Sequence, residues 1–181
     1  MPNDADDLAR HPDLAGLGAK MRSEWAAEQQ DATSDAMEQH QRGQGFRDWL
    51  TSAMHAGDRL AVTVVDQRFT GTVEEIGDDL LGLRPIFGRV DIHLAPGIPM
   101  HIELVDHPPS GGHRGNTDTS FAAAMAARDP EADMSLGTLF HPEGLDGVIT
   151  AGRDFVISKA RAGAVTVVPL AQVAWVSNRR T

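Results

Sequence analysis

The feature that most constrains this chain is an ungapped internal repeat with a shift of 75 residues. The identical pairs are Phe46 and Phe121, Asp58 and Asp133, Thr63 and Thr138, Val73 and Val148, Gly77 and Gly152, Asp79 and Asp154, Gly88 and Gly163, and Val90 and Val165. Because ordinary composition gives roughly 6% identity by chance, the count alone is weak, and the unbroken register with matched apolar positions carries the inference. The chain therefore contains a duplicated module.

The repeat divides the 181 residues into four segments. Residues 1–45 form a polar tail and a helical arm, residues 46–105 the first module, residues 106–120 a linker rich in proline and glycine, and residues 121–181 the second module. A module of about 60 residues has a marginal core when it is alone. We therefore expect the two modules to depend on each other for stability.

Each module reads as a short helix followed by five strands. Apolar residues at helical spacing predict a helix that starts at Phe46 and stops at Gly57, with its counterpart at Phe121 to Ala127. Alternating apolar residues and turn signals predict the strands. Their expected ranges are 60–64, 69–76, 79–84, 90–94 and 100–105 in the first module and 136–140, 145–151, 154–159, 165–168 and 173–176 in the second.

A turn with the same pattern lies between the second and third strands of each module. Gly77 and Gly152 are interpreted as turn residues that need a positive φ, which glycine adopts freely. Asp79 and Asp154, two residues later, are expected to accept hydrogen bonds from loop amides. Both pairs are thus interpreted as structural rather than functional.

A short helix before five strongly bent strands, with G-x-D between strands two and three, resembles the Sm-like or SH3-like small barrel. The whole arrangement, ending in V-P-L-A-Q-V-A-W-V, looks like a family of uncharacterised bacterial two-barrel proteins. The resemblance implies a mainly β fold of two tandem five-stranded barrels with an N-terminal helical arm. The base-contacting Asn and the Arg-Gly pair of Sm proteins are missing, so only the fold is carried over.

Composition excludes several classes of function. The chain has no cysteine, which excludes disulfides, thiolate zinc sites and cysteine nucleophiles. No long apolar run and no signal peptide are present, so we expect a cytoplasmic protein without a membrane partner. The absence of a G-x-S-x-G elbow or any local triad signature leads us to expect no enzymatic activity and no cofactor.

The densest set of metal-ligand side chains lies on two strands, and His93 and His101 are its weak metal candidates. Asp91 and His93 share one strand face, and His101 and Glu103 share another pair of positions. The repeat places Val168 opposite His93 and Val176 opposite His101. A fold that accepts valine there favours packing roles for both histidines.

In the arm, Leu14, Leu17, Met21 and Trp25 recur at spacings of three, four and four residues, as in one apolar stripe of a helix. This stripe is the predicted partner-helix contact. It packs against a barrel, covers an open barrel edge or pairs with a second copy of the helix, and the pattern fits all three.

Three hypotheses of function follow. The first is a non-catalytic interaction module that binds a protein partner or a second copy of itself. The second is binding of RNA or DNA through a basic face of the second module; the candidate residues are Arg153, Lys159, Arg161, Arg179 and Arg180. The net charge of −10 and the scarcity of aromatic residues disfavour that alternative. A metal-dependent enzyme built on the histidine-rich strands is the third.

Overall fold

The computed structural model describes residues 20, 25, 45–86, 88–108, 111–112 and 118–178. The chain divides between Gly45 and Phe46, and the fold reported below is that of the unit Phe46–Thr181. Of the apolar stripe predicted in the arm, Leu14, Leu17 and Met21 lie outside the described residues, whereas Trp25 is helical with its side chain 70% exposed. No helix among the described residues has the length and apolar character that crossing a membrane requires.

The first module begins with the helix α3 (Phe46–Ala56), as the sequence predicts. Its buried residues Leu50, Ala53 and Met54 follow the spacing of one helix face. The helix ends where Gly57 adopts a φ of +79°. There the N–H of Gly57 donates to the carbonyl of Met54 and the N–H of Asp58 to that of Ala53, which is the Schellman arrangement. The predicted stop at Gly57 is thereby confirmed.

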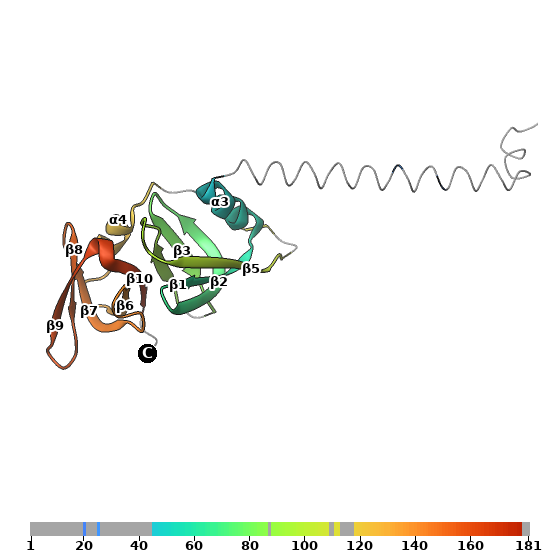
Figure 1. The fold of residues 1–181 in the computed structure, drawn as a ribbon. Helices are drawn as coiled ribbons and strands as arrows, with labels where there is room; N and C mark the ends of the chain where they lie inside the picture. Colours follow the sequence, from blue (N-terminus) through green and yellow to red (C-terminus); the bar gives the residue numbers. More distant parts are fainter. Residues whose placement is uncertain are drawn as a thin grey trace, which may run out of the picture. The chain divides into compact units, whose positions relative to one another are not determined.

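In the part of the chain that the structure describes, ten strands follow, in the order and near the bounds that the sequence predicts (Figure 1). In the first module they are β1 (Arg59–Val64), β2 (Gln67–Ile76), β3 (Leu80–Arg84), β4 (Val90–His93) and β5 (Met100–Asp106). The second module contains α4 (Phe121–Ala126), β6 (Asp133–Thr138), β7 (Leu145–Ala151), β8 (Phe155–Lys159), β9 (Val165–Pro169), the 3₁₀ turn η1 (Leu170–Gln172) and β10 (Val173–Asn178).

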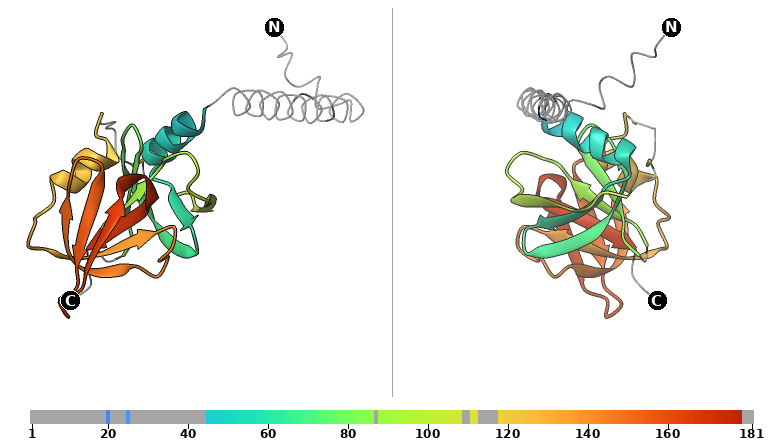
Figure 2. Two further views of the ribbon diagram at one scale, coloured as in Figure 1. Left: turned by 60° about the vertical axis from the view of Figure 1, so that its left-hand side comes forward. Right: turned by 90° about the vertical axis from the view of Figure 1, so that its right-hand side faces the viewer.

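All ten strands join one antiparallel sheet in the order β5-β1-β2-β3-β4-β10-β6-β7-β8-β9. The first five repeat in the second five, since β10 takes the place of β5, β6 that of β1 and β9 that of β4. Figure 2 shows the strands of the two halves curving beside each other. The mainly β fold is confirmed, but two separate closed barrels are not, because the sheet stays open. Neither module closes into a barrel of its own, because β4 of the first module pairs with β10 of the second.

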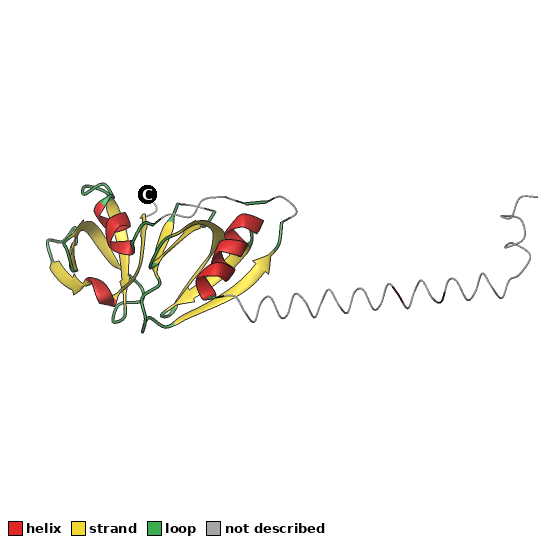
Figure 3. Cartoon of the chain, turned by 90° about the horizontal axis from the view of Figure 1, so that it is seen from above, coloured by secondary structure: helices red, strands yellow, loops and turns green. Residues whose placement is uncertain are grey.

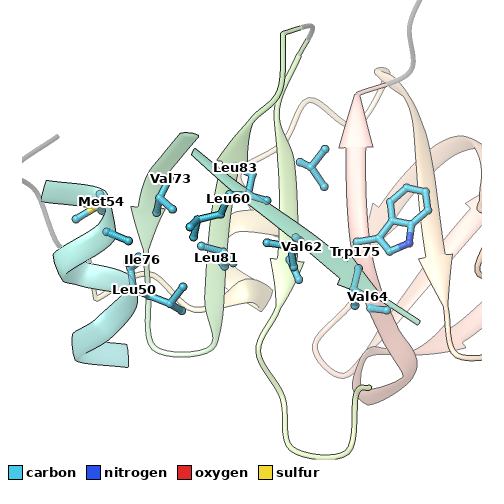
Figure 4. Close-up of a cluster of buried hydrophobic side chains, with 14 of the residues drawn as sticks. Leu50, Met54, Leu60, Val62, Val64, Val73, Ile76, Leu81, Leu83 and Trp175 are labelled. Atoms are coloured by element: carbon cyan, nitrogen blue, oxygen red, sulfur yellow. The ribbon is translucent and has the colours of Figure 1, made fainter. Parts of the chain in front are cut away.

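Among the described residues the helices and strands enclose two apolar cores, and each core takes side chains from both modules. Figure 3 shows the helices of each half lying beside its strands. The first core is built on α3 and β1–β4, and Ala174 and Trp175 of β10 complete it. Figure 4 shows Trp175 on β10 at the end of this cluster where Val62 and Val64 lie, and its ring meets that of Phe69 edge to face at 5.0 Å between centroids. The second core contains Leu80 of β3 among the residues of the second module. This exchange of side chains makes the two modules one packed unit.

The predicted conformation of two glycines is wrong. Positive φ angles occur at another repeated pair, Gly88 (+81°) and Gly163 (+88°), and not at Gly77 or Gly152. What requires glycine at position 77 is close approach, because a Cβ there would lie 1.8 Å from the carbonyl oxygen of Thr119. At Gly152 a Cβ would lie 2.6 Å from the ring of Phe155. These turns need a small residue rather than an unusual backbone angle.

This difference predicts unequal costs for the same substitution in the two repeats. Gly77→Ala forces a methyl group against the backbone at Thr119, which is held by a 3.1 Å hydrogen bond from Asp78 N–H, and we expect a loss of about 3 kcal/mol. Gly152→Ala meets a ring that is 37% exposed and can turn outward, and we expect about 1 kcal/mol. Urea unfolding of both variants measures the difference; equal costs would contradict this explanation.

Candidate functional site

The junction between the modules is formed by β4 and β10. These strands pair antiparallel, with Ile92 opposite Trp175, Asp91 opposite Val176 and Val90 opposite Ser177. Because β10 also pairs with β6 on its other side, its backbone groups are bonded along both edges. The junction is therefore the middle of the sheet.

A buried carboxylate marks this junction. Asp91 is 4% exposed at its side chain, and it accepts a hydrogen bond of 2.7 Å from Nε of Arg89 and one of 2.5 Å from Arg128 of the second module. Arg89 also bonds Glu75, and Arg128 donates to Oδ1 of Asn178 at 3.1 Å. A buried charge is tolerated when it is paired and hydrogen-bonded in this way. This network of ion pairs and hydrogen bonds joins β2, β4, β10 and the end of α4.

The same contacts shift the pKa of Arg89. Partial burial lowers this pKa, but hydrogen bonds and charge attraction from Glu75 and Asp91 more than offset the burial and leave it above its ordinary value. The guanidinium therefore stays charged at the junction.

His93 lies at the same junction and is a packing residue. Its ring stacks on Phe121 of the second module at 4.5 Å between centroids, and Nδ1 lies 3.0 Å from the carbonyl oxygen of Val173. Nε2 lies 3.3 Å from Oδ2 of Asp79. The other oxygen of Asp79 accepts a hydrogen bond from the N–H of Phe121 at 2.6 Å. The sequence had predicted that Asp79 bonds the amides of its own loop, but the carboxylate bonds the other module instead.

His101 lies on β5, away from the junction in the strand order, and is exposed. Its Nε2 is 3.2 Å from Glu103, which also accepts a 2.6 Å hydrogen bond from Arg68. The bond from Arg68, followed by the one from His101, lowers the pKa of Glu103 below its ordinary value. Within the described parts of the chain, no three His, Asp or Glu side chains are grouped to hold a metal ion.

Among the described residues the sheet ends at β5 and β9, and both strands carry exposed apolar side chains. Leu104 and Val105 on β5 are 54% and 48% exposed, and Val165 and Val167 on β9 are 60% and 61% exposed. Strand edges with exposed apolar residues pair readily with further strands. The sequence pattern missed them because it identifies strands without identifying which strands end a sheet; the unbroken V-T-V-V of β9 was the available signal.

An apolar groove adjoins the β5 edge. Its volume is about 460 Å³. The lining residues are Phe46 and Trp49 of α3, residues 94–98 of the β4–β5 loop, and Met100, His101 and Ile102 of β5. Phe46 is 56% exposed there. An extended strand with apolar side chains fits such a surface.

Of the basic residues proposed for nucleic acid, Arg153 and Lys159 lie apart along one strand. Arg153 stands before β8, whereas Lys159 ends this strand of five residues, so roughly 20 Å of extended chain separates them. Arg161, beyond Lys159, bonds Asp133. Arg179 and Arg180 lie outside the described residues.

A second hollow, of about 500 Å³, lies near the junction and is lined in part by Arg59, Arg68 and Arg89. Two of these arginines are bonded to carboxylates, Arg68 to Glu103 and Arg89 to both Glu75 and Asp91. Their charges are therefore largely neutralised, and the attraction of this hollow for an anion is weak.

Comparison with known proteins returns no matching family model, no matching characterised protein and no matching solved structure.

The junction network predicts a large effect of a single substitution. Asp91→Ala removes the carboxylate that Arg89 and Arg128 share and leaves a mostly buried guanidinium without it, so we expect the free energy of unfolding to fall by about 3–5 kcal/mol. The control is Arg84→Ala, which breaks the bond between Glu74 and an arginine that is 65% exposed, and we expect a change within about 1 kcal/mol. Chemical denaturation compares the two; similar losses would show that the junction ions stabilise no more than a surface pair.

Proposed function

We propose that this chain is a non-catalytic interaction protein that binds protein partners by strand addition at the free edges of its sheet. The observation that carries the proposal is the exposure of Val165 and Val167 on one terminal strand and of Leu104 and Val105 on the other. Strand addition supplies backbone hydrogen bonds and gives alternate side chains a surface to pack on. The groove beside β5 offers that surface.

We further infer that each half is a small barrel-like module of the Sm-like or SH3-like kind. Two observations support this reading: the strand order within each half is the same, and a short helix precedes each set of five strands. On this interpretation the modules do not close, and the terminal strands β5 and β9 of the open sheet are the surfaces that bind partners.

The proposal predicts where partners are captured. A photo-crosslinking amino acid placed at Val167 or Leu104 should join partner proteins in extracts of the source cell, because both positions lie on terminal strands. Phe140, which is 73% exposed but lies just after β6, is the matched control and should capture none. Adding Val165→Lys beside the Val167 probe should lower the yield several-fold, since a charge on an edge blocks pairing. Equal capture at all three positions, or none at any, would refute strand addition.

A further inference from the structure

The strand β2 extends beyond its partner β3. Its ladder with β3 begins at Thr72, which lies opposite Arg84. On its other side, the ladder with β1 already begins at Gln67, opposite Val64. Although β2 lies inside the sheet, its residues 67–71 therefore pair with a strand along one edge only, among the described residues. We call this stretch the free half-edge.

The backbone groups of the free half-edge have a defined direction. The N–H of Val65, next to β1, donates to the carbonyl of Pro99 at 2.9 Å, on the β5 side. Because backbone groups alternate along a strand, the preceding residue faces β2 and closes the two-residue hairpin with Gln67. The residues of β2 that face away from β1 are then Arg68 and Thr70. In the part of the chain that the structure describes, their backbone groups have no hydrogen bond on that side.

The hollow of about 500 Å³ lies along the free half-edge, since Arg68, Phe69 and Thr70 all line it. Phe69 packs against the first core and meets Trp175, whereas Arg68 reaches across β1 to Glu103. Successive side chains of a strand point to opposite faces, so a hollow that touches all three opens onto the edge of the strand. Its volume is within the range of ligand pockets, about 300–1,000 Å³.

One wall of the hollow is apolar and carries hydroxyl and amide groups at its rim. The lining residues beyond β2 include Pro85, Ile86, Val90, Ser135, Ser177 and Asn178. The side chain of Ile86 is 78% exposed, so an apolar residue placed against it would remove apolar surface from water. This wall fits the apolar side chains of an added strand.

The other side of the hollow carries a cation. Arg59 lies opposite Thr72, and it therefore shares a face of the sheet with Arg68 and Thr70. Among the described residues its guanidinium has no ion pair or hydrogen bond, whereas Arg68 and Arg89 are bonded to carboxylates. An acidic side chain on that face of an added strand would complement Arg59.

We propose that an extended peptide segment of a partner protein pairs with the free half-edge inside this hollow. Its apolar side chains pack on the wall that holds Phe69 and Ile86, and the alternate side chains, which are acidic, reach Arg59. Backbone hydrogen bonds with Arg68 and Thr70 supply most of the binding, which agrees with the weak attraction of the hollow for a free anion. The site lies on β2 and not on a terminal strand, so it goes beyond the proposed function.

A designed peptide tests the charge pattern. Fluorescein-labelled Val-Glu-Val-Glu-Val is titrated with the full chain, and binding is followed by anisotropy. It should bind several-fold more tightly than Val-Lys-Val-Lys-Val, although the net charge of −10 alone would favour the lysine peptide. Arg59→Glu should reverse this preference. The control Phe140→Glu adds a negative charge outside the hollow and should leave the preference unchanged.

Backbone pairing is tested on both partners. Thr70→Pro removes an N–H that faces the hollow and keeps the bonds to β1, so the melting temperature should change little while affinity falls at least roughly tenfold. Two further peptides carry N-methyl groups on the valines or on the glutamates. Since alternate N–H groups face opposite edges of a strand, one of these peptides should bind like the parent and the other should not bind.

Three outcomes would overturn the inference: no binding of either parent peptide, a preference unmoved by Arg59→Glu, or equal binding of the two methylated peptides. The methylated pair decides the point even where Thr70→Pro destabilises the fold. The proposed function has its own readout, which is crosslinking at Val167 and Leu104. Failure of the peptide site therefore leaves strand addition at the terminal strands standing, and the reverse also holds.

Discussion

The pairing of β4 with β10 is the interaction on which the rest of the structure depends. It turns two half-sheets into one, and it brings Trp175 into the first core and Leu80 into the second. The indole N–H of Trp175 is buried and has no hydrogen-bond partner among the described residues. An unpaired buried donor costs about 1–3 kcal/mol, so the packing of this ring must outweigh that cost. The close approach of Gly137, where a Cβ would lie 2.0 Å from the ring, shows how tightly it fits.

The two copies of the module have kept what the backbone requires and changed what they contact. Gly88 and Gly163 adopt the same positive φ, and the N–H groups of Gly77 and Gly152 donate to equivalent carbonyls at 2.8 Å. The differences fall at the junction, where the strand registers place Val167 and Pro169 of β9 at the positions that Asp91 and His93 hold on β4. One junction thus carries buried charge, whereas the corresponding outer faces are apolar.

The sequence was sufficient to predict the features that depend on local pattern. Alternation of apolar residues located all ten strands, and Gly57 marked the end of α3. Features that depend on distant contacts were missed. Nothing in the sequence identifies β10 as the partner of β4, since the paired residues are more than 80 positions apart, so closed barrels were expected. The conformation of Gly77 was predicted wrongly for the same reason: the group that excludes a side chain there belongs to Thr119, which is 42 residues away near the end of the linker.

Terminal strands such as β5 and β9 are prone to pair with strands of other chains, and charge does not prevent this pairing here. Natural edge strands are commonly protected by lysine, proline or inward-pointing charge. On β9, Val165, Thr166 and Val167 carry none, and proline enters only at its last residue. On β5 the carboxylate of Glu103 is engaged by Arg68 and His101, so its charge is partly neutralised by neighbours on the same surface. The strand addition that we propose accounts for the exposed apolar residues of these terminal strands, because a strand bonded along an edge removes the hazard that a charge would otherwise have to prevent.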